Sequence, residues 1–444
     1  MHSIGTKHAV RTRLAIALAC ACAVAWSLGP GAARAQESEY RLEIQGGAFK
    51  RISIKVLEPE IGEGASGGRK SASDGQESLA RDLIYSGLFY VMDHRSSPYL
   101  PSGVPRAWNA VNESPERQPH EIGMRWTVEA GQIVAELRLM DALGTQITGK
   151  RYTIGTTGVR GAMHHFADEV VKRLTGVDGI AQTKVAFARK RGPQSEIFMV
   201  DYDGFDERQV TSQNTLSLSP VWGVGRKWIA FTSYVDENPN LYRIDEGMSR
   251  MRVVSRYPGL NTAPDWSQSR QLFALTLTHE GNAEIYTMRE DGAGLKRLTH
   301  SPAIDTAPAW SPRGDQIAFT SDRAGIPQVF AMSGDGGNVR RLTFHNRYSD
   351  APAWSPDGRW IAYVSRWEDS IELRVMKPDG TNQRVVVSEG LNDSPSWAKD
   401  SRHIAFSSLR RNTRAIYVVD IYTGLERRLT SGSQDAITPA WSRD

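Results

Sequence analysis

The stretch that decides the fold is Ala351-Pro-Ala-Trp-Ser-Pro-Asp-Gly358, because versions of it recur through the second half of the chain. Six tryptophans follow one another at steps of 44, 44, 44, 43 and 44 residues, and each has a proline two positions before it. They are Trp222, Trp266, Trp310, Trp354, Trp397 and Trp441. A fixed period of about 40–45 residues is typical of β-propeller blades.

One repeat unit contains four short strands. After the Pro356-Asp-Gly358 turn, Trp360–Ser365 is rich in β-branched and aromatic residues, and Ile371–Met376 alternates apolar with polar residues. An Asp379-Gly380 turn then leads into Arg384–Val387. Since a blade is a four-stranded sheet, the repeat predicts a six-bladed propeller with the tryptophans in the core between blades.

The ends of the repeat predict how the ring closes. The second-strand motif first occurs at Val185-Ala-Phe187 without a preceding Pro-x-Trp, whereas Pro439-Ala-Trp441 stands alone near the C-terminus. We therefore expect the C-terminal strand to complete the blade that begins near Lys184, which leaves no free sheet edge. Small residues three positions before each tryptophan suit the crowding beside a central channel.

Residues 36–178 lack the repeat and predict a separate two-layer α/β domain, so the fold class is mainly β with an α+β module. Residues 60–75 and 96–120 are rich in Gly, Ser, Pro and charge and are expected to form loops. The expected strands are 40–44, 51–56, 121–128, 132–140 and 145–154, and the expected helices are 76–88 and 160–174.

The first 35 residues have the pattern of a cleaved signal peptide. Lys7, Arg11 and Arg13 precede the apolar stretch Leu14–Leu28, and Ala33-Arg-Ala35 gives the small-x-small pattern of a cleavage site. We predict cleavage between Ala35 and Gln36, with residues 179–444 forming the propeller. A membrane anchor needs about 20 apolar residues, more than this stretch offers. A lipoprotein is the other alternative, but neither Cys20 nor Cys22 follows the usual lipidation pattern.

Cleavage would change the charge of the chain. Four basic residues and no acidic one would be lost, so Lys+Arg falls from 54 to 50 and equals the 50 Asp+Glu. The formal charge of +4 then disappears, and with it any argument for nucleic-acid binding. Both cysteines are lost as well, which excludes disulfides and thiol chemistry from the mature chain.

Three motifs that can carry chemistry are coincidental here. Gly62-Glu-Gly-Ala-Ser-Gly67 matches a dinucleotide fingerprint, but polar residues separate it from the next helix and Glu63 would repel phosphate. The overlapping Gly64-Ala-Ser-Gly-Gly68 lies in a low-complexity loop, not in a nucleophile elbow. His164 and His165 are adjacent on a helix and cannot share one metal, so both are expected to be surface histidines.

The loop entering each inner strand is expected to open around the mouth of the channel. These positions hold Ser217 and Leu218, Asn261 and Thr262, Asp305 and Thr306, Ser349 and Asp350, Asn392 and Asp393, and Ala436 and Ile437. Asp, Asn and Ser are ordinary turn residues, which favours a partner-binding rim. The same oxygen ligands would also suit Ca²⁺, so a metal site is the alternative.

The whole mature chain resembles the TolB family of periplasmic propellers, part of the Tol–Pal cell-envelope system. The specific matches are Ala80-Arg-Asp-Leu-Ile-Tyr-Ser-Gly-Leu-Phe89, which resembles the first helix of the family, and the junction Asp168–Gly176 followed by Lys184-Val-Ala-Phe187 and Asp201-Tyr-Asp-Gly204. Residues 96–125 depart from the family pattern, as do Trp222-Gly-Val-Gly225 and Trp397-Ala-Lys-Asp400.

The resemblance implies a monomeric periplasmic scaffold without enzymatic activity, cofactor or metal, which supports outer-membrane integrity and constriction during cell division. It implies that the lipoprotein Pal binds the channel face, where the candidate residues are Asn261, Thr262, Asp305, Thr306, Asp350, Asn392 and Asp393. It also implies that TolA binds the mature N-terminal segment, through Glu39, Tyr40, Arg41, Leu42, Glu43 and Ile44. A Ca²⁺-dependent lactonase or lyase and a cell-wall carbohydrate-binding module remain the alternatives.

Overall fold

The computed structural model describes residues 50–62, 68–109, 118–155, 158–247, 250–344 and 348–443. The expected cleavage site, the segment Gln36–Ile44 and most of the glycine-rich Gly62–Gly68 stretch lie outside these ranges. No helix among the described residues is long and apolar enough to span a bilayer.

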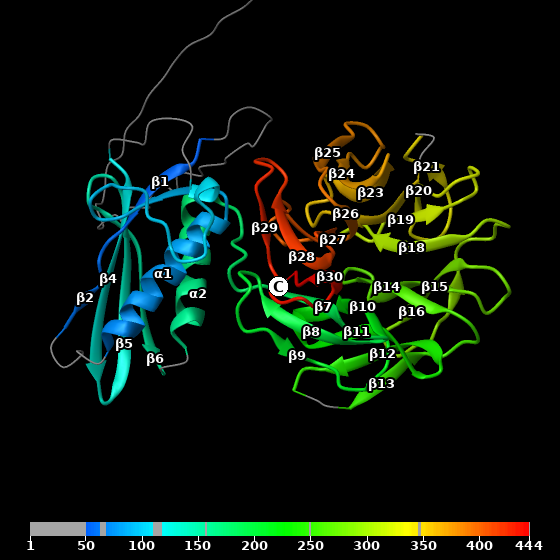
Figure 1. Cartoon of the computed structure of the whole chain (residues 1–444), viewed down its shortest axis with the longest axis horizontal. Coiled ribbons are helices and arrows are strands. Elements are labelled where there is room, and N and C mark those ends of the chain that lie inside the picture. Colours follow the sequence, from blue (N-terminus) through cyan, green and yellow to red (C-terminus); the bar gives the residue numbers. More distant parts are fainter. Residues whose placement is uncertain are drawn as a thin grey trace, which may run out of the picture. The chain divides into compact units, whose positions relative to one another are not determined.

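The N-terminal module is a mixed sheet with two helices packed on it (Figure 1). The strand order is β3-β1-β4-β5-β6, with β2 added to β4. The strands are β1 (Ile52–Val56), β2 (Glu60–Ile61), β3 (Phe89–Met92), β4 (His120–Glu129), β5 (Gln132–Met140) and β6 (Gln146–Ile154), and the helices are α1 (Arg69–Tyr85) and α2 (Val159–Thr175).

Helix α1 begins seven residues before the predicted start at Gln76, so the prediction that residues 69–75 form a loop is wrong. The reason lies in Gly75, where a Cβ atom would be 2.8 Å from the ring of Trp126 on β4. The missing side chain lets the helix continue across the tryptophan. The sequence pattern also missed β3, whose residues Phe89–Met92 are all buried.

The described residues of the rest of the chain form six four-stranded blades, of which the fifth and sixth are joined into one sheet by a single residue pair, Ile371 with Leu391. This confirms the predicted fold class. In five blades the strands follow chain order; in blade 1 the order is β30-β7-β8-β9, and the C-terminus lies beside that sheet (Figure 1). Blade 1 contains β7 (Lys184–Arg191), β8 (Gln194–Asp201), β9 (Arg208–Gln209) and β30 (Ala436–Trp441); blade 2 contains β10 (Ser217–Trp222), β11 (Trp228–Asp236), β12 (Asn238–Asp245) and β13 (Met251–Ser255); blade 3 contains β14 (Asn261–Ser267), β15 (Leu272–Leu277), β16 (Glu284–Arg289) and β17 (Lys296–Arg297). Blade 4 contains β18 (Asp305–Trp310), β19 (Gln316–Ser321), β20 (Gln328–Ser333) and β21 (Arg340–Arg341); blade 5 contains β22 (Ser349–Trp354), β23 (Ile361–Trp367), β24 (Ser370–Met376) and β25 (Arg384–Val387); blade 6 contains β26 (Leu391–Trp397), β27 (His403–Arg410), β28 (Thr413–Asp420) and β29 (Glu426–Arg428).

The six repeated tryptophans are buried between blades. Trp222 Nε1 donates to the Ala440 carbonyl of blade 1 (2.8 Å), and Trp397 Nε1 donates to the Ala353 carbonyl of blade 5 (3.0 Å). Each of these bonds joins a blade to its predecessor, so these two tryptophans both fill the core and fix the spacing of the ring.

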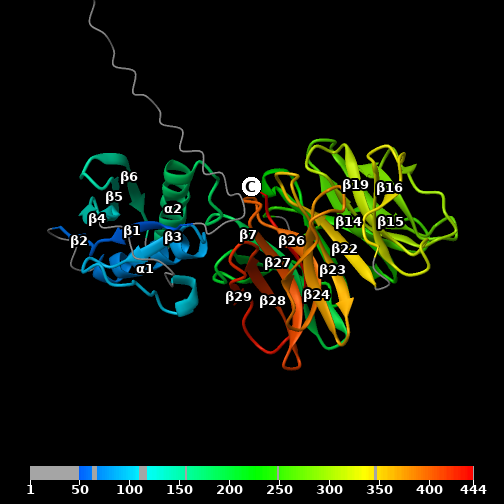
Figure 2. The same ribbon diagram turned by 90° about the horizontal axis from the view of Figure 1, so that it is seen from above.

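The alternating chain direction gives the propeller two distinct faces. The inner strands β10, β14, β18, β22, β26 and β30 begin at one of them, which we call the mouth face; Figure 2 shows β22, β23 and β24 side by side in one blade. Contacts with the N-terminal module lie at turns of the opposite face. Arg402 Nη2 donates to the Gly87 carbonyl (3.1 Å), and Tyr202 Oη donates to Asp82 Oδ1 (2.5 Å).

Candidate functional site

Each inner strand enters the channel through a β-bulge. The residue three positions before the tryptophan is left-handed in all six blades, with φ between 49° and 52°, and the pairing register shifts at that point. These residues are Ser219, Ala263, Ala307, Ala351, Ser394 and Thr438. A non-glycine residue with positive φ is strained, and bulges re-aim neighbouring side chains. The residue three positions before the tryptophan thus marks the bulge in every blade.

The bulge splits the predicted site residues into two sets. Residues five positions before the tryptophan are fully buried, and they include Asn261, Asp305 and Asn392. Residues four positions before it are partly or fully exposed beside the channel, and they include Thr262, Thr306, Asp350 and Asp393. The second set is completed by Leu218 and Ile437, which are also partly exposed.

The buried set holds the entry loops in place. Asn261 Oδ1 accepts hydrogen bonds from the Ser255 hydroxyl (2.5 Å) and the Tyr257 amide (3.0 Å), and its side-chain amide donates to the Tyr257 carbonyl (2.7 Å). Asp305 pairs with Arg323 (2.7 Å), and burial raises the Asp305 pKa although Ser321 and Arg323 lower it. These side chains therefore shape the mouth without being available at its surface.

The exposed set brings two carboxylates to the same side of the mouth. Thr320 Oγ1 donates to Asp350 Oδ1 (2.6 Å), and the Tyr348 hydroxyl donates to the other carboxylate oxygen. Desolvation beside the neighbouring side chains of the channel entry raises the pKa of Asp393, although part of its side chain reaches solvent, and the neighbouring Asp350 carboxylate raises it further. The pair makes this side of the mouth anionic, which suits N–H donors or cationic side chains of a partner.

The described residues at the mouth do not form a good metal site. Among the described residues, the cluster of three acidic or imidazole side chains close enough to share an ion is Asp82, His164 and Asp203, away from the channel entry. Asp305 points into the blade and is already paired with Arg323. The Ca²⁺ alternative therefore lacks the converging carboxylates that its donor set would need.

Apolar side chains on the loops of the mouth face were missed by the sequence analysis. Phe344 is 68% exposed and Trp367 is 48% exposed. The other exposed apolar residues of this face are Val235, Leu260, Ile304 and Ile326. Val235 and Trp367 lie at the ends of β11 and β23, and the others lie in strand-connecting loops. All are outside the repeat motif, and the available signal was the presence of large apolar residues in otherwise polar segments. Exposed apolar groups around a polar centre are typical of protein-binding surfaces.

The prediction that His164 is a surface histidine is wrong, whereas His165 is exposed. His164 Nδ1 lies 2.7 Å from Asp82 Oδ2, and the Tyr202 hydroxyl donates to the other oxygen of Asp82. Arg160 Nη2 donates to Asp203 (2.9 Å). Burial lowers the His164 pKa, but the Asp82 carboxylate more than offsets this and raises it. The three potential metal ligands thus already satisfy one another through this network, which ties α1 and α2 to the β8–β9 turn.

Comparison with known proteins gives a consistent result. The Tol-Pal system protein TolB of Methylobacillus flagellatus is 33% identical over 196 residues, 43% of this chain and 44% of the relative. That of Geobacter metallireducens is 35% identical over 192 residues, again 43% and 44%. The chain therefore matches less than half the length of each of these relatives. The crystal structure of TolB from Acinetobacter baumannii superposes with a TM-score of 0.74 at 24% identity, covering 90% of this chain and 99% of that one, which shows a shared fold.

A family model described as the TolB beta propeller domain matches residues 171–444, more than half of the chain. The match covers all six blades. The chain belongs to the TolB β-propeller domain family.

Proposed function

We propose that this chain is a non-enzymatic scaffold of the Tol–Pal cell-envelope system, which acts in the periplasm and binds the lipoprotein Pal at the mouth of the propeller channel. The observation that carries the proposal is the mouth itself: an anionic, hydroxyl-lined centre surrounded by exposed apolar side chains. The named relatives, which are Tol-Pal system proteins, support the assignment to this system.

The aromatic and the acidic residues of the mouth are expected to contribute to binding in different ways. Phe344 and Trp367 offer large apolar areas, and aromatic side chains carry much of the energy of protein interfaces. Asp350 and Asp393 orient the partner by accepting hydrogen bonds. The buried Asn261, Asp305 and Asn392 act indirectly, by fixing the loops from which Thr262 and Thr306 reach the channel.

We propose further that TolA binds the N-terminal segment Gln36–Ile44. The alternation of Tyr40, Leu42 and Ile44 with charged residues suits strand addition to the sheet of a partner, where main-chain hydrogen bonds give affinity. Binding TolA through this segment and Pal at the channel mouth would let a monomer connect the two membranes, in support of outer-membrane integrity and of constriction during division.

The test is calorimetric titration of residues 36–444 with the soluble domain of Pal from the same organism. We expect micromolar or tighter binding, lost in the Thr262→Arg, Thr306→Arg double variant. Gln268→Arg, an exposed residue in a turn of the opposite face, is the matched control and should bind normally. Absence of binding, or equal binding by the double variant, would contradict the proposal.

A second candidate function is recognition of cell-wall glycan, which the exposed Trp367 and Phe344 favour because aromatic faces stack on sugars. Titration with soluble muropeptides distinguishes the two. Saturable binding that is lost in Trp367→Ala, while Pal gives no heat, would favour the glycan over the protein partner.

A further inference from the structure

Most neighbouring blades are joined by a glycine on the opposite face. The glycine lies in the turn between the third and fourth strands and packs against the outer strand of the preceding blade, with positive φ throughout. A Cβ atom would lie 2.1 Å from the Val254 carbonyl oxygen at Gly292, 2.7 Å from that of Leu298 at Gly336, 2.8 Å from that of Leu342 at Gly380 and 2.8 Å from that of Leu429 at Gly204. Only a residue without a side chain can make this contact.

A basic residue strengthens several of these joints. Lys296 Nζ donates to the Asp335 carbonyl (3.2 Å), and Arg340 Nη2 donates to the Pro378 carbonyl (3.1 Å), both in the turn of the following blade. Arg427 does the same to the Tyr202 carbonyl where blade 6 meets blade 1. All three occupy the same position of the outer strand, three residues before a threonine.

Among the described residues, neither contact is found at the junction of blades 1 and 2, and the glycine contact is also absent where blade 5 meets blade 6, because a Cβ atom at Gly424 would meet nothing within 4 Å. In the sequence, Met248 occupies the position of the joint glycine, and the neighbouring Gly247 has no atom within 4 Å of the place where a Cβ would be. Arg208 holds the position of the basic residue, but its Nε lies 3.0 Å from Met199 Sδ of its own blade. Trp222 Nε1, which donates to the Ala440 carbonyl (2.8 Å), remains as a link between these two blades.

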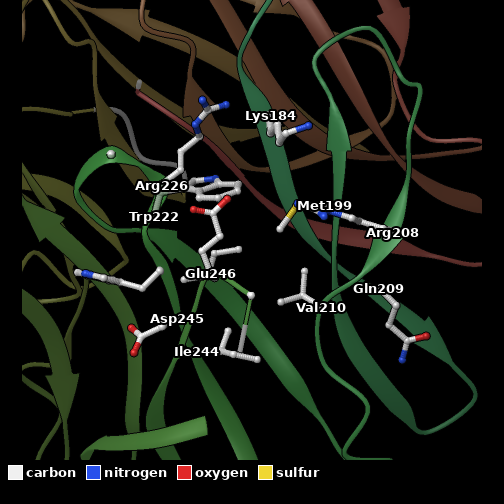
Figure 3. A pocket seen from close by; sticks show the side chains of 14 residues that line it. Lys184, Met199, Arg208, Gln209, Val210, Trp222, Arg226, Ile244, Asp245 and Glu246 are labelled. Carbon is white, nitrogen blue, oxygen red and sulfur yellow. The ribbon is translucent and has the colours of Figure 1, made fainter. Parts of the chain in front are cut away.

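A cavity of about 310 Å³ fills this junction (Figure 3). Its floor is apolar, and Met199, Val210, Trp222 and Ile244 point into it from both blades. Its rim is charged, with Lys184, Arg208, Arg226, Asp245 and Glu246. An apolar floor with a few polar groups at the edge is the usual composition of a ligand site.

The charges of the rim select the ligand. Lys184 is paired with Asp201, and Asp245 is paired with Arg243 (2.7 Å) and Arg252. Arg208 and Arg226 have no carboxylate partner among the described residues, although Arg226 donates to the Gln182 carbonyl (2.8 Å). These two arginines outnumber the one unpaired carboxylate of the rim, that of Glu246, and a positive rim above an apolar floor favours an apolar group with a carboxylate next to it.

The Glu246 carboxylate favours a peptide over a lipid as the ligand of this cavity. Its carboxylate lies over the cavity near Trp222 in Figure 3 and has no ionic partner among the described residues. It can accept a hydrogen bond from an amide N–H of a peptide, a donor that a fatty acid does not have. We propose that this cavity, which we call the blade 1–2 pocket, binds a polypeptide segment in which an acidic residue follows a large apolar one.

In this complex the apolar side chain lies on Trp222 and Val210, and the acidic side chain accepts hydrogen bonds from Arg208 and Arg226. The pocket is on the face opposite the channel mouth, so a partner held there leaves the mouth open. The site is independent of the proposed binding of Pal.

The experiment uses residues 36–444 labelled with ¹³C at the methionine methyl groups, with the Met199 signal identified by its loss in Met199→Leu. The probes are N-acetyl-Phe-Glu-amide, its neutral analogue N-acetyl-Phe-Gln-amide, and decanoate. We expect the Met199 signal to shift saturably with the acidic peptide at millimolar concentration. Loss of the charged contacts in the neutral analogue should weaken binding by about tenfold or more.

Two variants test the site itself. Arg208→Gln with Arg226→Gln should weaken binding of the acidic peptide about tenfold, and Val210→Trp, which fills the cavity, should abolish it. Arg340→Gln, the matched change in blade 4, should bind like the wild type, and the other methionine signals report whether each variant is folded. Equal binding of both peptides, binding of decanoate alone, no shift of Met199 at 10 mM peptide (a concentration of the order at which a ligand of this size binds weakly), or equal loss in Arg340→Gln would each overturn the proposal.

Discussion

The joint glycines give the sharpest test of how the ring is held together. Gly292 and Gly247 both lie in turns between third and fourth strands, with φ of 82° and 72°. They differ in their surroundings: a Cβ atom at Gly292 would lie 2.1 Å from the Val254 carbonyl oxygen, whereas one at Gly247 would meet nothing within 4 Å. Gly292→Ala and Gly247→Ala therefore form a matched pair.

Both substitutions strain the backbone, because a left-handed residue with a side chain costs about 1–2 kcal/mol. Alanine also lowers the conformational entropy of the unfolded chain, which stabilises the folded state of both variants by about 0.4–1 kcal/mol. At Gly292 the methyl group must also displace a backbone carbonyl, and such overpacking costs about 1–3 kcal/mol. We expect Gly292→Ala to be less stable than Gly247→Ala by about 1–3 kcal/mol.

The assay is urea unfolding of residues 36–444, followed by tryptophan fluorescence, together with the thermal midpoint. Each kcal/mol should lower the melting temperature by about 2–4 °C in a domain of this size. The m-value should stay constant, since neither change alters the surface exposed on unfolding. If the two variants unfold at the same urea concentration, the close approach at Gly292 does not contribute to the joint between blades 2 and 3.

Three further predictions concern buried groups and ring closure. Asp82 raises the His164 pKa, so the protonated histidine stabilises the folded state. His164→Gln should therefore lower the free energy of unfolding by about 1–3 kcal/mol below about pH 6.5, and this loss should shrink as the pH rises through the folded-state pKa. Urea unfolding from pH 5.5 to 9 measures it. Removing residues 435–444 deletes β30, so limited proteolysis should cut within blade 1 while the full-length chain resists. Arg323→Leu leaves the Asp305 carboxylate buried without its cation and should cost about 3–5 kcal/mol, and Asp305→Asn in the same chain should recover part of this loss in a thermal melt.

The amino-acid sequence determined the architecture because its signals are local and repeated. The period of the Pro-x-Trp motif gives the number of blades, and the misplaced half-repeats at Val185 and Trp441 indicate that the two ends belong to one blade. Each signal is an alternation or a turn within a few residues, and six copies reinforce one another. The same logic located helix α2 within one residue at each end.

The orientation of the mouth residues depended on the tertiary structure. Adjacent residues such as Asn261 and Thr262 must face opposite sides of a strand, but the sequence does not say which side is the channel. A bulge at Ala263 and its five counterparts settles this, because it changes the register between the first and second halves of each inner strand. Of the predicted rim, Asp393 is exposed and Thr262, Thr306 and Asp350 are partly exposed, whereas Asn261, Asp305 and Asn392 are buried.

Contacts between distant segments were decided only by the tertiary structure. His164 is buried because Asp82 and Tyr202, each far away in the sequence, come to lie beside it. The blade 1–2 pocket likewise is lined by residues of two blades, Met199 and Val210 from one and Trp222 and Ile244 from the other, which meet only in the folded ring. The sequence determined the blades, whose bonds are local; the folded chain decided the sites, whose residues meet only when the ring has closed.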